Sequence, residues 1–143
     1  MTASERHFVT HATEETIALG QRVELPELGL AAVWEKIPAG DKIQASFTIF
    51  SFSCVNICDT LSLTRRREGD TITLAGRSGR RSLKKLLIGA RVPRRERDRI
   101  PVVRQNGAVL AVYGFGQAEG LRPAPGEPYY IVAIRKNTEE ERE

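Results

Sequence analysis

The sequence predicts an α+β domain that consists mostly of antiparallel sheet. Short strand-like segments bounded by Pro and Gly recur on both sides of one helical stretch, and an Asn-Gly pair near the end of the chain marks a tight hairpin. Strands grouped around a small helical part favour an α+β arrangement over alternating βαβ units. We therefore expect an antiparallel sheet, or a partly open barrel, that carries a short helical hairpin.

The first strands are expected between residues 17 and 60. The segments TIALGQRVEL, LGLAAVWEKI and KIQASFTIFSFSCVNI are separated by turn-forming residues, namely Pro26, Gly29 and the PAGD stretch at 38–41. In the third segment Phe47 and Ile49 would face one side and Phe50 the other, so we expect this strand to be covered on both faces.

A hairpin is expected over residues 59–76, DTLSLTRRREGDTITLAG. Apolar Leu and Ile alternate with Ser and Thr on both sides of a turn that contains Glu68, Gly69 and Asp70. This pattern would place Arg65 to Arg67 at the tip or edge of the hairpin.

The helical part is expected at residues 82–98. Leu83, Leu86, Leu87 and Ala90 follow the i, i+3, i+4, i+7 pattern of an amphipathic helix, and Ser82 can cap its N-terminus. The apolar stripe would be buried and Lys84, Lys85 and Arg91 would face water. Pro93 ends this helix and can begin a second short one, PRRERD.

Two strands joined by Asn106 and Gly107 follow, and the segment PYYIVAIRK is the last expected strand. We divide the chain into a β-rich N-terminal segment or linker subdomain at residues 1–59, a C-terminal domain at 60–136 and an acidic tail at 137–143. The tail contains too few apolar residues to pack, so we expect it to be disordered. The N-terminal segment could equally be part of the same sheet.

Positive charge is concentrated in the middle of the chain. Residues 65–104 contain 14 Lys and Arg against 4 Asp and Glu, a net charge of +10, whereas the remainder has a net charge of −6. A solvated surface would explain charge but not its concentration on two adjoining helices, so we favour a polyanion partner, with nucleic acid the first candidate. Residues 53–112 contain no Phe, Tyr or Trp, which favours contacts with a duplex backbone over stacking on single-stranded bases.

Evidence for a catalytic site is weak. The sequence has no GxxxxGK[ST] phosphate loop, and GFGQAEG lacks the dinucleotide-binding spacing. Asp70, Glu96 and Asp98 lie among arginines, so we expect them to orient arginines, with Arg94 and Asp98 as an i, i+4 pair, rather than to act as acid and base. We assign no catalytic residue.

A metal site and a membrane location are also disfavoured. His7 with His11 and Cys54 with Cys58 could supply four zinc ligands, but their spacing is not that of a common zinc finger or ribbon, and two reduced cysteines in a core are the simpler interpretation. No apolar run approaches the roughly 20 residues that span a bilayer, and the N-terminus lacks the apolar region of a signal peptide. We therefore expect no metal, no membrane partner and a cytoplasmic location.

The stretch RRREGDTITLAGRSGRRSLKKLLIGARVPRRERDRIPVVRQNGAVLAVYGFG resembles the C-terminal domain of tRNA(Ile)-lysidine synthetase. The resemblance covers about residues 60–118 and consists of ordered elements: Arg65 to Arg67, Gly69 with Asp70, the basic loop 76–81, the helix 83–87, Val92 with Pro93, Glu96 to Asp98, and Ile100 to Val102. Residues 1–59 match weakly. The same fold also resembles a domain of the phenylalanyl-tRNA synthetase β chain.

The resemblance implies part of an ATP-dependent ligase that attaches lysine to the wobble cytidine of an isoleucine tRNA. The SGGxDS loop of the family's catalytic domain does not occur here, so the chain should be inactive alone, and ATP and Mg would act only in the full-length enzyme. The implied partners are the acceptor-stem region of isoleucine tRNA and the catalytic domain of the same enzyme. The tRNA contacts carried over by position are Arg80, Arg81, Lys84, Lys85, Arg91, Arg94, Arg95 and Arg97.

Two points stay open. The loop GRSGRR contains more arginine than is usual in the family, which leaves open which of its residues touches RNA. The alternative function is a protein-interaction module whose basic helices bind an acidic partner or the catalytic domain.

Overall fold

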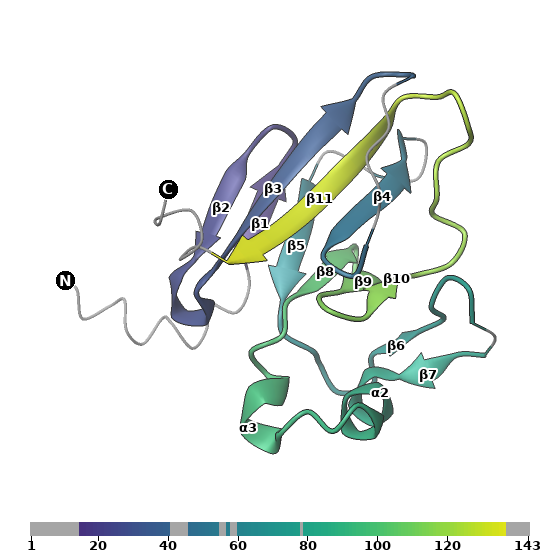
Figure 1. Cartoon of the computed structure of the whole chain (residues 1–143). Helices are drawn as coiled ribbons and strands as arrows, with labels where there is room; N and C mark the ends of the chain where they lie inside the picture. Colours follow the sequence, from purple (N-terminus) through teal and green to yellow (C-terminus); the bar gives the residue numbers. More distant parts are fainter. Residues whose placement is uncertain (1–14, 41–45, 55–56, 58–59, 78, 137–143) are drawn as a thin grey trace.

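The computed structural model describes residues 15–40, 46–54, 57, 60–77 and 79–136, and every strand pair in it is antiparallel. Two open sheets lie in layers, and a small two-stranded sheet and two short helices lie at one end (Figure 1). The predicted α+β class with mostly antiparallel sheet is therefore confirmed, and the sheets are open rather than closed into a barrel.

The larger sheet has the order β1-β5-β8-β9-β10. Its strands are β1 (Glu15–Ala18), β5 (Thr60–Thr64), β8 (Val102–Gln105), β9 (Ala108–Val112) and β10 (Gly116–Gln117). As predicted, β8 and β9 are joined by Asn106 and Gly107, whose φ angles of 51° and 86° are those of a tight hairpin turn.

The second sheet has the order β2-β3-β11-β4. Its strands are β2 (Arg22–Leu25), β3 (Leu30–Ile37), β11 (Tyr129–Lys136) and β4 (Ile49–Ser53), and the 3₁₀ helix η1 (Pro26–Leu28) connects β2 to β3. Pairs β1–β5, β3–β11 and β4–β11 each join residues on both sides of residue 59. The acidic tail at 137–143 lies outside the described residues.

The segment TIALGQRVEL, expected as a single strand, forms two. A turn at Leu19 and Gly20 separates β1 from β2, and the Gln21 side chain accepts a hydrogen bond of 2.7 Å from the Ala18 amide. Gly20 has a φ angle of 85°, a conformation that favours glycine. The turn sends β1 into one sheet and β2 into the other, so the segment expected as one strand is divided between the two layers.

The hairpin expected over residues 59–76 is wrong. Strand β5 pairs with β1 and β8, whereas β6 (Thr71–Ile72) pairs with β7 (Arg81–Ser82) in the two-stranded sheet. The Asp70 carboxylate accepts hydrogen bonds from the Arg67 amide and from the buried Arg104 side chain. These contacts hold the chain in a turn after β5 and direct β6 away from the sheet.

The main core lies between the two sheets. Trp34 of β3 and Phe50 and Phe52 of β4 have no exposed surface, and they pack with apolar residues of β1, β5, β8, β9 and β11. The rings of Trp34 and Tyr130 meet edge to face with their centroids 5.6 Å apart. The prediction that the third N-terminal segment is covered on both faces is confirmed over β4, where Ser51 and Ser53 are also buried, whereas Phe47 is 64% exposed.

A second apolar cluster covers the other face of the larger sheet. It joins Val102 and Val112 of the sheet to Ile72, Leu74, Leu83 and Leu86. Helix α2 (Leu83–Gly89) begins at Ser82, whose side chain accepts a 3.0 Å hydrogen bond from the Lys85 amide, as predicted. Leu83, Leu86 and Leu87 are buried as expected, but Ala90 is exposed because the helix ends one residue before it.

Candidate nucleic-acid interface

The strongest candidate for a functional site is a groove at the end of the molecule where the two helices lie. It runs between the segment after β5 and the helices α2 and α3 (Arg94–Arg97), and it has a volume of about 880 Å³. We call it the basic groove, because its lining contains six basic and three acidic side chains among Arg65, Arg66, Arg67, Glu68, Gly69, Asp70, Ser82, Lys84, Arg94, Arg97 and Asp98. Figure 1 shows the chain between β5 and β6 passing beside α2 and α3.

One wall of the basic groove is formed by the helices. Lys84 projects from the first turn of α2, and Arg94 and Arg97 come from α3. Lys84 and Arg94 are exposed and make no ion pair with any described residue. Arg97 is half-buried, and its Nε donates a 3.1 Å hydrogen bond to the Val92 carbonyl, so this side chain also fixes the connection between the two helices.

The other wall is the segment Arg65 to Arg67. These arginines were expected at the tip or edge of a hairpin and were not among the predicted contacts. In the structure they face α3, and Arg66 Nε lies 3.3 Å from Asp98 Oδ1. The run of three arginines was a signal in the sequence for a second basic wall. It was not used, because the incorrect hairpin placed these residues away from the two basic helices.

A buried ion pair forms the base of this wall. Arg104 is 3% exposed, and its two terminal nitrogens each donate a 2.8 Å hydrogen bond to one oxygen of Asp70. Its Nε also donates to Thr64 Oγ1 at 3.2 Å, and a terminal nitrogen reaches the Arg65 carbonyl at 3.4 Å. One arginine of β8 therefore connects the end of β5, the arginine segment and the turn before β6.

The environment of Asp70 affects its protonation. Burial raises the pKa of this carboxyl, but the hydrogen bonds from Arg104 and from the Arg67 amide, together with the nearby positive charges, outweigh burial and hold the pKa below its usual value. The ion pair is therefore charged at neutral pH.

The three carboxylates that we expected to orient arginines each pair with an arginine, as predicted. Asp70 binds Arg104, Asp98 lies beside Arg66, and Glu96 lies 3.8 Å from Arg99. The expected pair between Arg94 and Asp98 does not form, since Arg66 of the opposite wall contacts Asp98 instead.

The eight predicted contact residues do not share one surface. Lys84, Arg94 and Arg97 line the basic groove, whereas Arg80 lines a separate hollow with Thr71, Thr73 and Glu119, next to the β8–β9 turn. The other four are exposed but line neither hollow: Arg81, Lys85, Arg91 and Arg95. The structure thus gathers three of the eight with the arginine segment.

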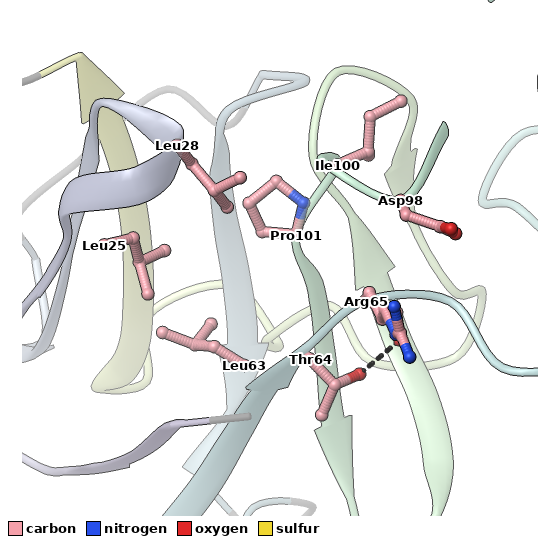
Figure 2. A pocket seen from close by; sticks show the side chains of 8 residues that line it. All are labelled: Leu25, Leu28, Leu63, Thr64, Arg65, Asp98, Ile100 and Pro101. Carbon is pink, nitrogen blue, oxygen red and sulfur yellow. Dashed lines mark hydrogen bonds between the residues drawn. The ribbon is translucent and has the colours of Figure 1, made fainter. Parts of the chain in front are cut away.

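A small apolar cavity adjoins the basic groove. Figure 2 shows its lining from η1, β2 and β5 and from the segment after α3, with Arg65 and Asp98 on its polar side. Its volume is about 20 Å³, enough for roughly one water molecule, and most of its lining is apolar: Leu25, Leu28, Leu63, Ile100 and Pro101. We interpret it as a packing gap beneath the arginine wall rather than a ligand site.

The other sequence hypotheses find little additional support. His7, His11 and Cys58 lie outside the described residues, and within the described part of the chain no three potential metal ligands come together. Cys54 is a free thiol that donates a hydrogen bond of 3.6 Å to the Pro128 carbonyl. Among the described residues no helix is long and apolar enough to cross a membrane.

Sequence comparisons identify related proteins. The chain is 39% identical over 66 residues to a tRNA(Ile)-lysidine synthase of Alkalilimnicola ehrlichii, covering 46% of this chain and 15% of that protein. It is 37% identical over 73 residues to the tRNA(Ile)-lysidine synthase of Geobacillus kaustophilus, covering 50% of this chain and 16% of that protein. The matched region is therefore a small part of each of these relatives.

A solved structure described as the TILS C-terminal domain superposes with a TM-score of 0.75 and 27% sequence identity, covering 86% of this chain and 97% of that one. The family model for the TilS substrate C-terminal domain matches residues 61–133. This range is just over half of the chain and contains the whole basic groove. The chain therefore belongs to the family of TilS substrate C-terminal domains.

Proposed function

We propose that this chain is the tRNA-binding C-terminal part of a tRNA(Ile)-lysidine synthetase and that it holds the acceptor-stem region of isoleucine tRNA. Catalysis, ATP and Mg belong in this proposal to another part of the enzyme, and the chain alone is inactive. The observation that carries the proposal is the basic groove, where two walls of cationic side chains face each other.

The chemistry of the groove suits a duplex backbone. Exposed Lys and Arg side chains bind phosphates and release counterions, and such contacts fix the position of a nucleic acid without reading its bases. The described residues of α2, α3 and the arginine segment include no aromatic side chain on which a base could stack. Recognition would therefore rely on the shape, phosphates and 2′-hydroxyls of a helical stem.

Charge reversal at the first turn of α2 tests the proposal. Lys84→Glu with Lys85→Glu should weaken binding to isoleucine tRNA by about 3 kcal/mol, roughly 150-fold, because Lys84 in the groove and Lys85 beside it on the first turn of α2 both become repulsive to phosphate. The matched control is Lys36→Glu with Lys136→Glu, which makes the same change in net charge on exposed positions of β3 and β11. Equal losses in both variants would indicate nonspecific attraction and would contradict a defined site.

The choice of RNA separates an acceptor-stem grip from other functions. Binding should be measured to isoleucine tRNA, elongator methionine tRNA and an acceptor-stem minihelix at low and moderate salt. The proposal requires that the minihelix bind nearly as well as the whole tRNA and that affinity fall steeply with salt. If no RNA binds while the separately expressed catalytic domain forms a complex, the protein-interaction alternative is correct.

A further inference from the structure

We infer that Arg65 and Arg66 bind backbone phosphates of duplex RNA directly, so that the basic groove takes the strand between the arginine segment and the helices. This inference rests on the proposed function and adds to it a binding wall that the sequence resemblance did not assign. The ligand is defined by its chemistry: a phosphodiester backbone with closely spaced negative charges.

Arg65 and the helix cations lie on opposite walls of the basic groove. Arg65 is exposed, and its guanidinium makes no hydrogen bond or ion pair with any described residue, although it lines the basic groove. Lys84 and Arg94 line the same groove from the helices. A phosphate chain lying in the groove would therefore meet cations on both sides, whereas a chain bound only to the exposed helix surface would meet them on one.

The hydrogen-bonding capacity of Arg66 is only partly used within the protein. Its Nε is buried and has no hydrogen-bond partner among the described residues, because the Asp98 carboxylate at 3.3 Å is not in hydrogen-bonding geometry. A buried donor without a partner is unfavourable, and a guanidinium can bind a phosphate through two nitrogens. A ligand cannot reach the buried Nε, but no hydrogen bond to a described residue occupies the two terminal nitrogens of Arg66, and these can donate to a phosphate.

The backbone of the arginine segment is fixed by hydrogen bonds. The Thr64 hydroxyl donates a 2.7 Å hydrogen bond to the Arg65 carbonyl, and the Arg67 amide donates to Asp70 at 2.6 Å. Both acceptor residues are in turn bound by the buried Arg104. The segment is therefore held at both ends before any ligand arrives, which lowers the entropic cost of binding.

Two of the three acidic side chains in the groove lining are paired with arginines, whereas Glu68 is exposed and makes no ion pair with a described residue. Asp70 forms a buried ion pair with Arg104, and Asp98 lies beside Arg66. Asp98 is about half exposed, so a phosphate and this carboxylate would compete for the same arginine. Removing the charge of Asp98 should therefore improve RNA binding, an effect opposite to that of removing the arginines.

The test uses Arg65→Ala with Arg66→Ala and measures the affinity for the acceptor-stem minihelix over a range of salt concentrations. We expect the Kd to rise by about 10- to 100-fold and the magnitude of the slope of log Kd against log salt to fall by about 2, one for each lost phosphate contact. The control Arg135→Ala, an exposed arginine of β11 on the other sheet, should leave the slope unchanged.

Two further variants distinguish the loss of a phosphate contact from a loss of affinity caused by misfolding. Arg65→Lys with Arg66→Lys keeps both charges and should restore the salt slope with only part of the affinity, since lysine lacks the arginine fork. Asp98→Asn should lower the Kd by about 2- to 5-fold, in line with the strength of an exposed ion pair. A merely structural role for Arg66 would instead make Asp98→Asn neutral or harmful.

The outcomes distinguish this inference from the proposed function. If the Lys84 and Lys85 variant weakens binding but the Arg65 and Arg66 variant leaves both Kd and slope unchanged, the arginine wall is not a phosphate site and only the helices bind. If the unaltered chain binds no duplex RNA, both proposals are wrong.

Discussion

The two faces of the larger sheet are covered in different ways. One face packs on the four-stranded sheet through large apolar side chains with no exposed surface, among them Trp34, Phe50 and Phe52. The other face is covered by a seven-residue helix and two strands of two residues each, of which the helix supplies Leu83 and Leu86 and β6 supplies Ile72. The buried pair of Arg104 and Asp70 lies in the same layer.

This difference between the two faces indicates that one layer provides most of the stability and the other provides the binding surface. Elements as short as α2, β6 and β7 would not be stable by themselves, so they depend on the sheet beneath them and on polar contacts at their ends. These short elements bury few apolar groups, and they place lysines and arginines at the surface. The sheet-to-sheet core maintains the fold, and the opposite layer presents charge.

The largest expected effect comes from the main core. Trp34→Ala should lower the free energy of unfolding by about 3–5 kcal/mol, because it removes a fully buried ring and leaves a cavity. Denaturant unfolding measures this loss. As a comparison, Leu83→Ala should cost about 2–3 kcal/mol and should speed amide hydrogen exchange in α2 more than in β3. Equal exchange in both elements would show that the two layers open together.

The buried ion pair is the next test. Asp70→Asn should cost about 3 kcal/mol, because it leaves Arg104 charged and buried with weaker acceptors. The matched control is Glu24→Gln, which removes the carboxylate of the exposed pair with Arg22 and should cost less than about 1 kcal/mol. Similar losses from the two substitutions would contradict the special position that we give to Arg104 and Asp70.

The same pair predicts a pH dependence. Because the pKa of Asp70 is lowered in the folded state, its contribution to stability is complete above the pKa of the unfolded chain, about 3.9, and is lost as the pH falls through the lower folded pKa. Melting temperatures measured from pH 6 to pH 2 should therefore fall more steeply at the acidic end for the unaltered protein than for Asp70→Asn. Parallel curves would show that Asp70 does not contribute.

The smallest expected effect is at the helix cap. Ser82→Ala should cost about 1 kcal/mol, since the Lys85 amide loses its hydrogen-bond acceptor. Thermal unfolding measures the change, and Ser82→Asp, which keeps an acceptor, should restore most of the stability. If Ser82→Ala weakens the free energy of RNA binding by more than it lowers the free energy of unfolding, the cap also positions Lys84.

Local signals predicted the helical part and the late hairpin accurately. The leucine spacing, the position of Ser82 and the Asn106-Gly107 pair each describe contacts between residues close in sequence, and the structure confirms all three. The prediction failed where a strand pairs with a residue far away in the sequence. Leu63 and Ile72 have the alternation of a hairpin, yet Leu63 pairs with Val103 and Ile72 with Arg81.

The sequence alone therefore determined the class of fold, the helix with its cap, and the concentration of positive charge in residues 65–104, because propensity, periodicity and charge are properties of neighbouring residues. Only the tertiary structure decided that Arg65 to Arg67 lie opposite the helices and that Arg80 lies in another hollow. The physical reason is that Arg104, more than thirty residues away, binds Asp70 and turns the chain after β5, a contact that alternation along the sequence cannot reveal.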